Sequence, residues 1–173
     1  MADVPECRAS GRLLRAWLSA CVLLSFAASA AAGVCEPLMI QGTPAQCACS
    51  KKNWAAIDEQ LRALDIESPQ ELASLVRTFL CRSGDKATAS LRRSMPKLIA
   101  TSAYATGEEG TSHGRVSRSE VTPLGGHAWD AGVSKEGAQV ELSYAPNEAC
   151  VASASFIHKL GGWLLVGIGD ACD

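Results

Sequence analysis

The histidines are the side chains best suited to catalysis or metal binding, but their positions favour neither role. His127 and His158 fall on predicted strands whose directions put them at opposite ends of one sheet. Because a strand rises about 3.3 Å per residue, they lie roughly 25–30 Å apart and cannot share a metal ion. Asp130 follows His127 at an odd spacing and points to the other face, which argues against a catalytic dyad. We therefore predict no catalytic residue, no metal site and no cofactor.

Asp170 is the most unusual acidic residue, because strand alternation turns it toward the predicted core. It falls near the same end of the sheet as three ring-bearing side chains, those of Trp129, Tyr144 and His127. A carboxylate at the mouth of an aromatic-lined pocket can bind a ligand or act as a base. These four residues form the predicted ligand site. The alternative is that Asp170 simply ends its strand and reaches solvent.

A polar, glycine-rich stretch over residues 106–114 provides a second candidate surface. Its composition predicts an exposed, flexible loop between a helical half and a strand half of the chain. The loop holds Glu108, Glu109 and His113, and exposed loops often carry binding residues. These three side chains are the predicted contacts to a partner, and the alternative is that they are only solvated.

The N-terminal residues predict export. Three arginines among residues 8–15 precede an uncharged apolar run over residues 16–34 that ends in small side chains. This order is typical of a secretory signal peptide, which we place at residues 1–32. Because about 20 apolar residues can also span a bilayer, an uncleaved anchor is the alternative. Cleavage would leave one domain over residues 33–173, without a membrane span.

Six cysteines in the predicted domain indicate three disulfides and a periplasmic or secreted location. An antiparallel pair of helices would bring Cys49 beside Cys81, with about 4.5 Å of helix rise between them. A hairpin register places Cys150 directly opposite Cys172, at a separation that suits a disulfide. The remaining pair is Cys35–Cys47. Exchange of Cys47 and Cys49 between these pairs is the main alternative.

Three helices are predicted in the first half of the domain. Ser50 caps the first helix, whose apolar residues recur at helical spacing. Ser68-Pro-Gln-Glu71 reads as a capping box with proline at the first helical position. Asp85 caps a shorter third helix, which Pro96 ends.

Two hairpins are predicted in the second half, and together they form a four-stranded antiparallel meander. One turns at Glu136-Gly137 and the other at Leu160-Gly161-Gly162. The facing pairs that these turns imply are Trp129 with Tyr144, Ala131 with Leu142, Val133 with Val140, Phe156 with Val166, Ala154 with Ile168 and Cys150 with Cys172. The face expected to point inward holds Trp129, Ala131, Val133, Val140, Leu142, Tyr144, Ala152, Ala154, Phe156, Leu164, Val166 and Ile168. The fold class is therefore α+β, with three helices packed on one face of the meander.

The element order supports a resemblance at the level of the fold. Helices followed by a meander that closes on Lys-Leu-Gly-Gly-Trp-Leu-Leu-Val-Gly-Ile at residues 159–168 resemble the cone-shaped nuclear transport factor 2-like (cystatin-like) fold. The resemblance covers residues 50–170 and implies a conical sheet. That fold hosts enzymes, ligand binders and interaction modules, so the resemblance implies no activity and assigns no residue a role.

Charge and composition narrow the choice of function. With 16 Lys+Arg against 18 Asp+Glu, the formal charge of −2 gives no basic footprint for nucleic acid. We predict an exported, non-enzymatic binding module, such as an inhibitor or immunity-type protein for an envelope or secreted partner. The alternative is a small-ligand binder or enzyme that uses a conical pocket on the concave face of the sheet.

Overall fold

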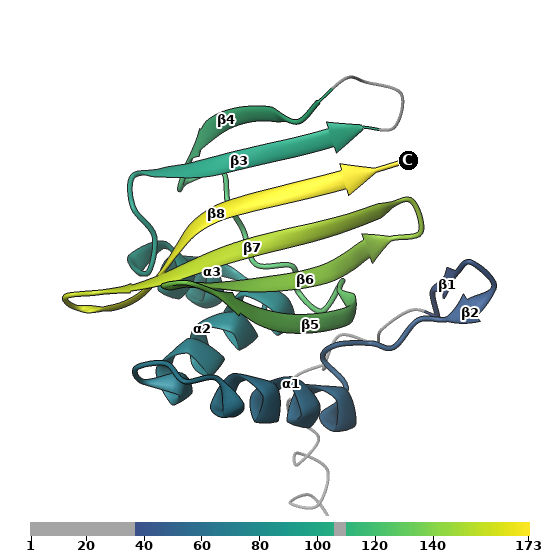
Figure 1. Ribbon diagram of the computed structural model, residues 1–173, viewed down its shortest axis with the longest axis horizontal. Coiled ribbons are helices and arrows are strands. Elements are labelled where there is room, and N and C mark those ends of the chain that lie inside the picture. The colour runs from purple at the N-terminus through teal and green to yellow at the C-terminus, as the bar shows by residue number, and fades with distance from the viewer. Residues whose placement is uncertain (1–36, 106–109) are drawn as a thin grey trace, which may run out of the picture. The chain divides into compact units, whose positions relative to one another are not determined.

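A computed structural model describes residues 37–105 and 110–173 (Figure 1). The predicted leader, its alternative as an anchor, Cys35, Glu108 and Glu109 lie outside the described residues. Within the described ranges, no helix combines the length and the apolar character needed to cross a bilayer.

The three predicted helices are confirmed, as α1 (Lys51–Ala63), α2 (Pro69–Cys81) and α3 (Asp85–Arg93). Ser50 caps α1 as expected, because its Oγ accepts a hydrogen bond from the Asn53 backbone N–H at 3.2 Å. The capping box at Ser68 is wrong. Ser68 has left-handed backbone angles, φ 48° and ψ 55°, and its side chain makes no capping hydrogen bond. A capping side chain needs its residue in the extended region of backbone space. Asp85 is the first residue of α3, and Gly84 takes the cap position.

Six strands form one mixed sheet in the order β4-β3-β8-β7-β6-β5, and the three helices lie on one of its faces (Figure 1). The strands are β3 (Leu98–Ala105), β4 (Ser112–Ser117), β5 (Trp129–Glu136), β6 (Gln139–Asn147), β7 (Cys150–Lys159) and β8 (Gly162–Cys172). A separate short hairpin joins β1 (Met39–Ile40) to β2 (Thr43–Pro44). The α+β class is confirmed.

The predicted strand count is wrong, because β3 and β4 extend the meander. β3 runs parallel to β8 and antiparallel to β4. The predicted loop at 106–114 is therefore too long, since Ser112, His113 and Gly114 belong to β4. The sequence did not predict β3 because its small and hydroxylated side chains alternate only weakly between apolar and polar. Its parallel pairing with β8 spans a long sequence separation, so no turn motif marks it in the sequence.

The predicted register of the first hairpin is wrong by two residues. The turn lies at Gly137-Ala138, with Gly137 at φ 59°, so that Val133 faces Leu142. A positive φ at the first central position alone is the geometry of a type II′ turn, which takes glycine at that position. An irregularity between Trp129 and Gly132, where Asp130 has φ 50°, then pairs Trp129 with Ala145.

The second hairpin is confirmed at its open end and differs near its turn. Cys150 faces Cys172 and Ala154 faces Ile168, as predicted. Beyond Ser155 the register shifts by one, so Phe156 faces Leu165 and Val166 is left as the extra residue of a bulge.

The bulge changes which side chains of β8 face the helices. Trp163 and Leu165 are buried there, so the prediction that Leu164 and Val166 point inward is wrong. The Leu165 backbone N–H donates to the Ser94 carbonyl at the end of α3, at 2.8 Å. α3 thus takes the place of a neighbouring strand along this part of β8.

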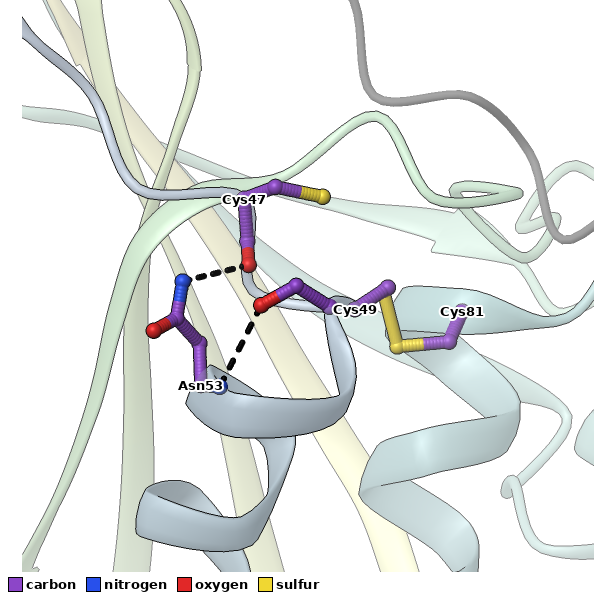
Figure 2. The surroundings of a disulfide bond; sticks show 5 residues. Cys47, Cys49, Asn53 and Cys81 are labelled. Atoms are coloured by element: carbon purple, nitrogen blue, oxygen red, sulfur yellow. Dashed lines mark hydrogen bonds between the residues drawn. A yellow bond between two sulfur atoms is a disulfide. The ribbon is translucent and has the colours of Figure 1, made fainter.

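Two of the predicted disulfides are confirmed. Cys49 bonds Cys81 with a Cα–Cα distance of 5.5 Å (Figure 2), and Cys150 bonds Cys172 with a Cα–Cα distance of 4.1 Å. The exchange of Cys47 and Cys49 is therefore excluded. Cys47 also takes part in a disulfide, but because Cys35 lies outside the described residues, the Cys35–Cys47 pair stays a prediction. The Asn53 side chain donates to the Cys47 carbonyl at 2.8 Å and fixes this segment on α1 (Figure 2).

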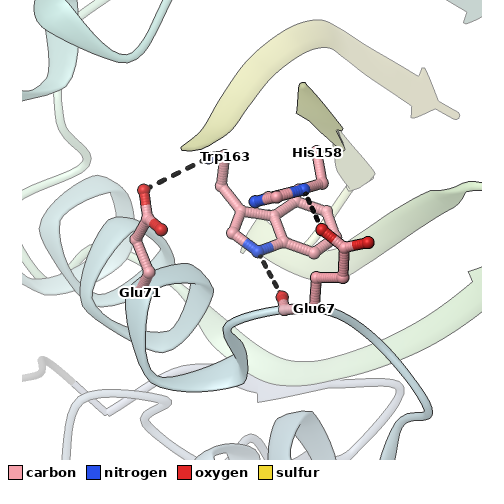
Figure 3. Close-up of polar contacts among 4 residues, drawn as sticks. All are labelled: Glu67, Glu71, His158 and Trp163. Atoms are coloured by element: carbon pink, nitrogen blue, oxygen red, sulfur yellow. Dashed lines mark hydrogen bonds and ion pairs between the residues drawn. The ribbon is translucent and has the colours of Figure 1, made fainter. Parts of the chain in front are cut away.

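Trp163 joins the β7–β8 turn to the helical layer (Figure 3). Its indole N–H donates to the Glu67 carbonyl at 2.8 Å, and its backbone N–H donates to Glu71 Oε1 at 3.3 Å. His158 lies against the same indole ring, with Nδ1 2.8 Å from Glu67 Oε2. His158 is therefore a packing residue of the described fold.

Gly162→Ala tests this junction. Gly162 has φ 114°, and a Cβ there would overlap Glu71 Oε1, whereas Gly161, at φ 110°, has nothing nearby. We expect Gly161→Ala to lower the free energy of unfolding by about 1–2 kcal/mol through backbone strain. Gly162→Ala should cost about 1 kcal/mol more, because it displaces the acceptor of the Trp163 N–H.

Urea denaturation measures both variants, and the Glu71→Ala background supplies the control. The extra loss at Gly162 should disappear there, since the overlapping side chain is gone. An equal loss for the two glycine variants in the wild-type background would contradict the close approach.

Candidate functional site

A hollow of ≈ 310 Å³ lies on the helix-covered face of the sheet, at the end closed by the Cys150–Cys172 disulfide. Its walls come from the end of α2, the segment over residues 118–128, and strands β4, β6, β7 and β8. The lining residues are Phe79, Val116, Glu120, Val121, Thr122, Leu124, Tyr144, Ala152, Ile168, Gly169 and Asp170. We call this hollow the rim pocket.

Strand register brings the polar groups of the rim pocket together. Tyr144 on β6 faces Ala152 on β7, and Ala152 faces Asp170 on β8. Three adjacent strands therefore present their side chains on the same face, with the Tyr144 and Asp170 backbones about 10 Å apart. The small methyl group of Ala152 lies between the phenol and the carboxylate, which leaves the space that forms the pocket floor.

The 118–128 segment is a fixed wall, although it has no helix or strand of its own. The Leu124 N–H donates to the Phe79 carbonyl at 2.7 Å, and the Gly126 N–H donates to the Leu80 carbonyl at 2.8 Å. Val121 is buried and packs in the hydrophobic core. These contacts tie the wall to the last turn of α2, which the Cys49–Cys81 disulfide also holds.

Tyr144 is the buried polar side chain of the rim pocket. It is 6 % exposed, and its ring meets Phe79 edge to face at 5.9 Å. No described residue forms a hydrogen bond with its hydroxyl group. Burial, and secondarily the negative charge of Asp170, raise the pKa of Tyr144 to about 12. The phenol is therefore protonated near neutral pH, and Tyr144 lines the pocket without a hydrogen-bond partner for its hydroxyl group among the described residues.

Two exposed carboxylates, those of Asp170 and Glu120, stand at the edge of the rim pocket. Glu120 Oε1 accepts the Ser117 backbone N–H at 3.1 Å. Asp170 Oδ2 lies 3.6 Å from Cys172 Sγ, but a disulfide sulfur carries no proton to donate. Neither carboxylate is ion-paired within the described residues, and the lining holds no Lys, Arg or His. The edge therefore carries two carboxylates without an ion-pair partner among the described residues, although Arg92 donates to the Ser119 carbonyl next to Glu120 at 2.8 Å.

The four predicted pocket residues separate into two pairs. Tyr144 and Asp170 line the rim pocket, but Trp129 and His127 do not. Trp129 is buried, and its ring lies 6.4 Å from that of His127, which is exposed. Where the chain is described, no three His, Cys, Asp or Glu side chains are grouped to hold a metal ion.

The predicted partner residues lie elsewhere. His113 is on β4 opposite Ser102 and borders a depression on the outer face of the sheet, with Ser153 and Ser155. Glu108 and Glu109 lie outside the described residues.

Sequence reasoning missed Phe79, Val121 and Glu120 as pocket residues. Phe79 reads as an ordinary core position of α2, and the other two fall in a segment without periodicity. The available signal was the apolar content of Val121-Thr-Pro-Leu124 between two polar stretches, which indicates a segment packed onto the core.

Comparisons with known proteins give a likeness at the level of the fold. No family model and no curated protein matches the chain. A crystal structure of an NTF2-like protein with a cystatin-like fold from Novosphingobium aromaticivorans is similar, with 17 % identity and a TM-score of 0.37. It covers 70 % of this chain and 89 % of its own.

A protein from work on de novo design of diverse pocket structures is also similar, with 11 % identity and a TM-score of 0.33. It covers 60 % of this chain and 96 % of its own. The Novosphingobium protein has the fold that the sequence resembles. At these identities the likeness concerns the fold alone, and no function follows from it.

The titration of Tyr144 tests the environment of the rim pocket. In a Tyr104→Phe variant, Tyr144 is the remaining tyrosine of the chain. We expect the tyrosinate absorbance to rise with a midpoint of about 12 in the folded protein, and near 10 in urea. Because the folded-state pKa is the higher one, the contribution of Tyr144 to stability is constant below pH 10 and is lost as pH rises toward 12.

Asp170→Asn serves as the control for the cause of this shift. It should lower the midpoint only part of the way, since burial is the larger cause. A folded-state midpoint near 10 would contradict a buried phenol.

Proposed function

We propose that this protein is an exported binding protein that takes a small, largely apolar molecule into the rim pocket. The observation that carries the proposal is the pocket itself. Its volume of ≈ 310 Å³ falls at the lower end of the range of about 300–1,000 Å³ typical of small-molecule sites. Apolar walls with a few convergent polar groups are the usual composition of such sites.

The cysteine chemistry supports a location outside the cytoplasm. The two described disulfides suggest an oxidising environment, because cytosolic thiols are kept reduced. The basic and apolar composition of residues 8–34 supports export by a signal peptide. Periplasmic and secreted locations both fit this chemistry.

The polar groups of the rim pocket support binding more than catalysis. Tyr144 and Asp170 are separated by a whole strand, and the lining holds no histidine. A general base must lie within hydrogen-bond reach of the proton it removes, and a nucleophile needs such a base beside it. None of the lining side chains is paired with another in that way.

An inhibitor or immunity-type protein, acting through Glu108, Glu109 and His113, is the second form of this proposal. His113 lies on the outer face and is exposed, which suits contact with a protein partner. The rim pocket has the more specific support, because apolar walls and the Tyr144 phenol line the same hollow.

Ligand uptake is tested with the neutral apolar dye N-phenyl-1-naphthylamine, whose fluorescence rises in apolar sites. We expect saturable binding by the oxidised protein. Ala152→Leu should weaken binding by about tenfold or more, because the larger side chain fills the pocket floor. Val151→Leu is the matched control, since Val151 is the neighbouring residue on the exposed outer face.

Thermal melting of both variants checks that they fold. Equal dye binding by the wild type, Ala152→Leu and Val151→Leu would place the dye elsewhere and refute the pocket.

A further inference from the structure

We propose that the ligand of the rim pocket is a cationic amphiphile, an apolar body that carries a protonated amine. This inference rests on the proposed function and names the class of molecule that the same site takes. It follows from three features of the pocket: two carboxylates without an ion-pair partner among the described residues, a phenol without a hydrogen-bond partner there, and apolar walls.

The negative charge at the pocket edge favours a positively charged ligand. Asp170 and Glu120 both line the hollow, and no basic side chain lines it with them. The described residues offer neither carboxylate an ion-pair partner, although the chain as a whole is nearly neutral. A ligand cation at this edge would supply the missing charge, whereas an anion would meet two like charges.

The phenol supplies a second contact for the same group. Tyr144 is almost fully buried, and its hydroxyl has no hydrogen-bond partner among the described residues. An ammonium group has three N–H donors and no acceptor. Set above Ala152, it can donate to the Asp170 carboxylate and to the lone pairs of the Tyr144 oxygen. The charge-assisted bond to the carboxylate is the stronger of the two.

The remaining walls fit an apolar body. Phe79 from α2, Val121 from the 118–128 segment and Ile168 from β8 bound the interior of the hollow. Burial of apolar surface there provides affinity that does not depend on charge. The site therefore separates into an apolar interior and an anionic edge, which matches a molecule with one apolar end and one amine end.

Three ligands with one shared body test this inference. They are 4-phenylbutylamine, 4-phenyl-1-butanol and 4-phenylbutanoate, measured directly by titration calorimetry near neutral pH with the oxidised protein. We expect the amine to bind about tenfold more tightly than the alcohol, and the carboxylate more weakly than both. Added salt should reduce the amine preference, because the edge is open to solvent.

Variants that remove a carboxylate test whether the preference for the amine comes from the edge of the rim pocket. Asp170→Asn and Glu120→Gln should each reduce the ratio of amine to alcohol affinity, and the double variant should bring the ratio close to one while alcohol binding persists. Glu141→Gln is the matched control, since Glu141 does not line the rim pocket and its loss removes the same charge; it borders a second depression that also reaches Asp170, so the Glu120→Gln result assigns the preference to the rim pocket.

The outcomes separate this inference from the proposed function. Binding of the alcohol without an amine preference, or a preference that survives in the double variant, overturns the cationic ligand and leaves the apolar pocket standing. Failure of all three ligands and of the neutral dye to bind overturns both. An amine preference lost equally in Glu141→Gln would reduce it to a general effect of net charge and also overturn the inference.

Discussion

One extra residue in β8 determines what the helix-covered face of the sheet can hold. Strict alternation would put Trp163 and Leu165 on one face and Ile168 and Asp170 on the other. The bulge at Val166 turns both pairs toward the helices. It occurs where β3 ends its pairing with β8 and the Ser94 carbonyl of α3 accepts the Leu165 N–H instead. The same strand thereby contributes to the packed core at one end and to the rim pocket at the other.

The two ends of the helix-covered face differ in the size of their side chains. Near the β7–β8 turn, the large side chains of Phe156, Leu165 and Trp163 are buried beneath the helices. Near the Cys150–Cys172 disulfide, Ala152 leaves a gap, and the 118–128 segment covers it instead of a helix. A disulfide at the open end of the hairpin holds the strand pair that positions Ala152 and Asp170, where strand ends otherwise fray. The rim pocket and the Cys150–Cys172 disulfide therefore lie at the same end of the sheet.

Sequence reasoning succeeded where the signal was local and failed where pairing was distant or irregular. Helical spacing and turns predicted α1 to α3, and the register counted back from Cys172 placed Asp170 correctly. Continuing the same register past Val166 toward the turn placed Leu164 on the inward face, which is wrong, because nothing in the sequence marks a one-residue bulge. The parallel β3–β8 pair and the 118–128 wall depend on long-range contacts, so half of the pocket lining could not be inferred. Trp129 was placed in the pocket because its strand was read without the irregularity at Asp130.

The most direct test of the account is to locate a bound amine by nuclear magnetic resonance. In the complex with 4-phenylbutylamine, the account predicts magnetisation transfer from the phenyl protons to the methyl groups of Val121 and Ile168 inside the rim pocket. Val151, exposed on the outer face of β7, should receive none. Transfer to Val151 or to the outer-face Val166, without transfer to Val121 and Ile168, would contradict the claim that this hollow is the binding site.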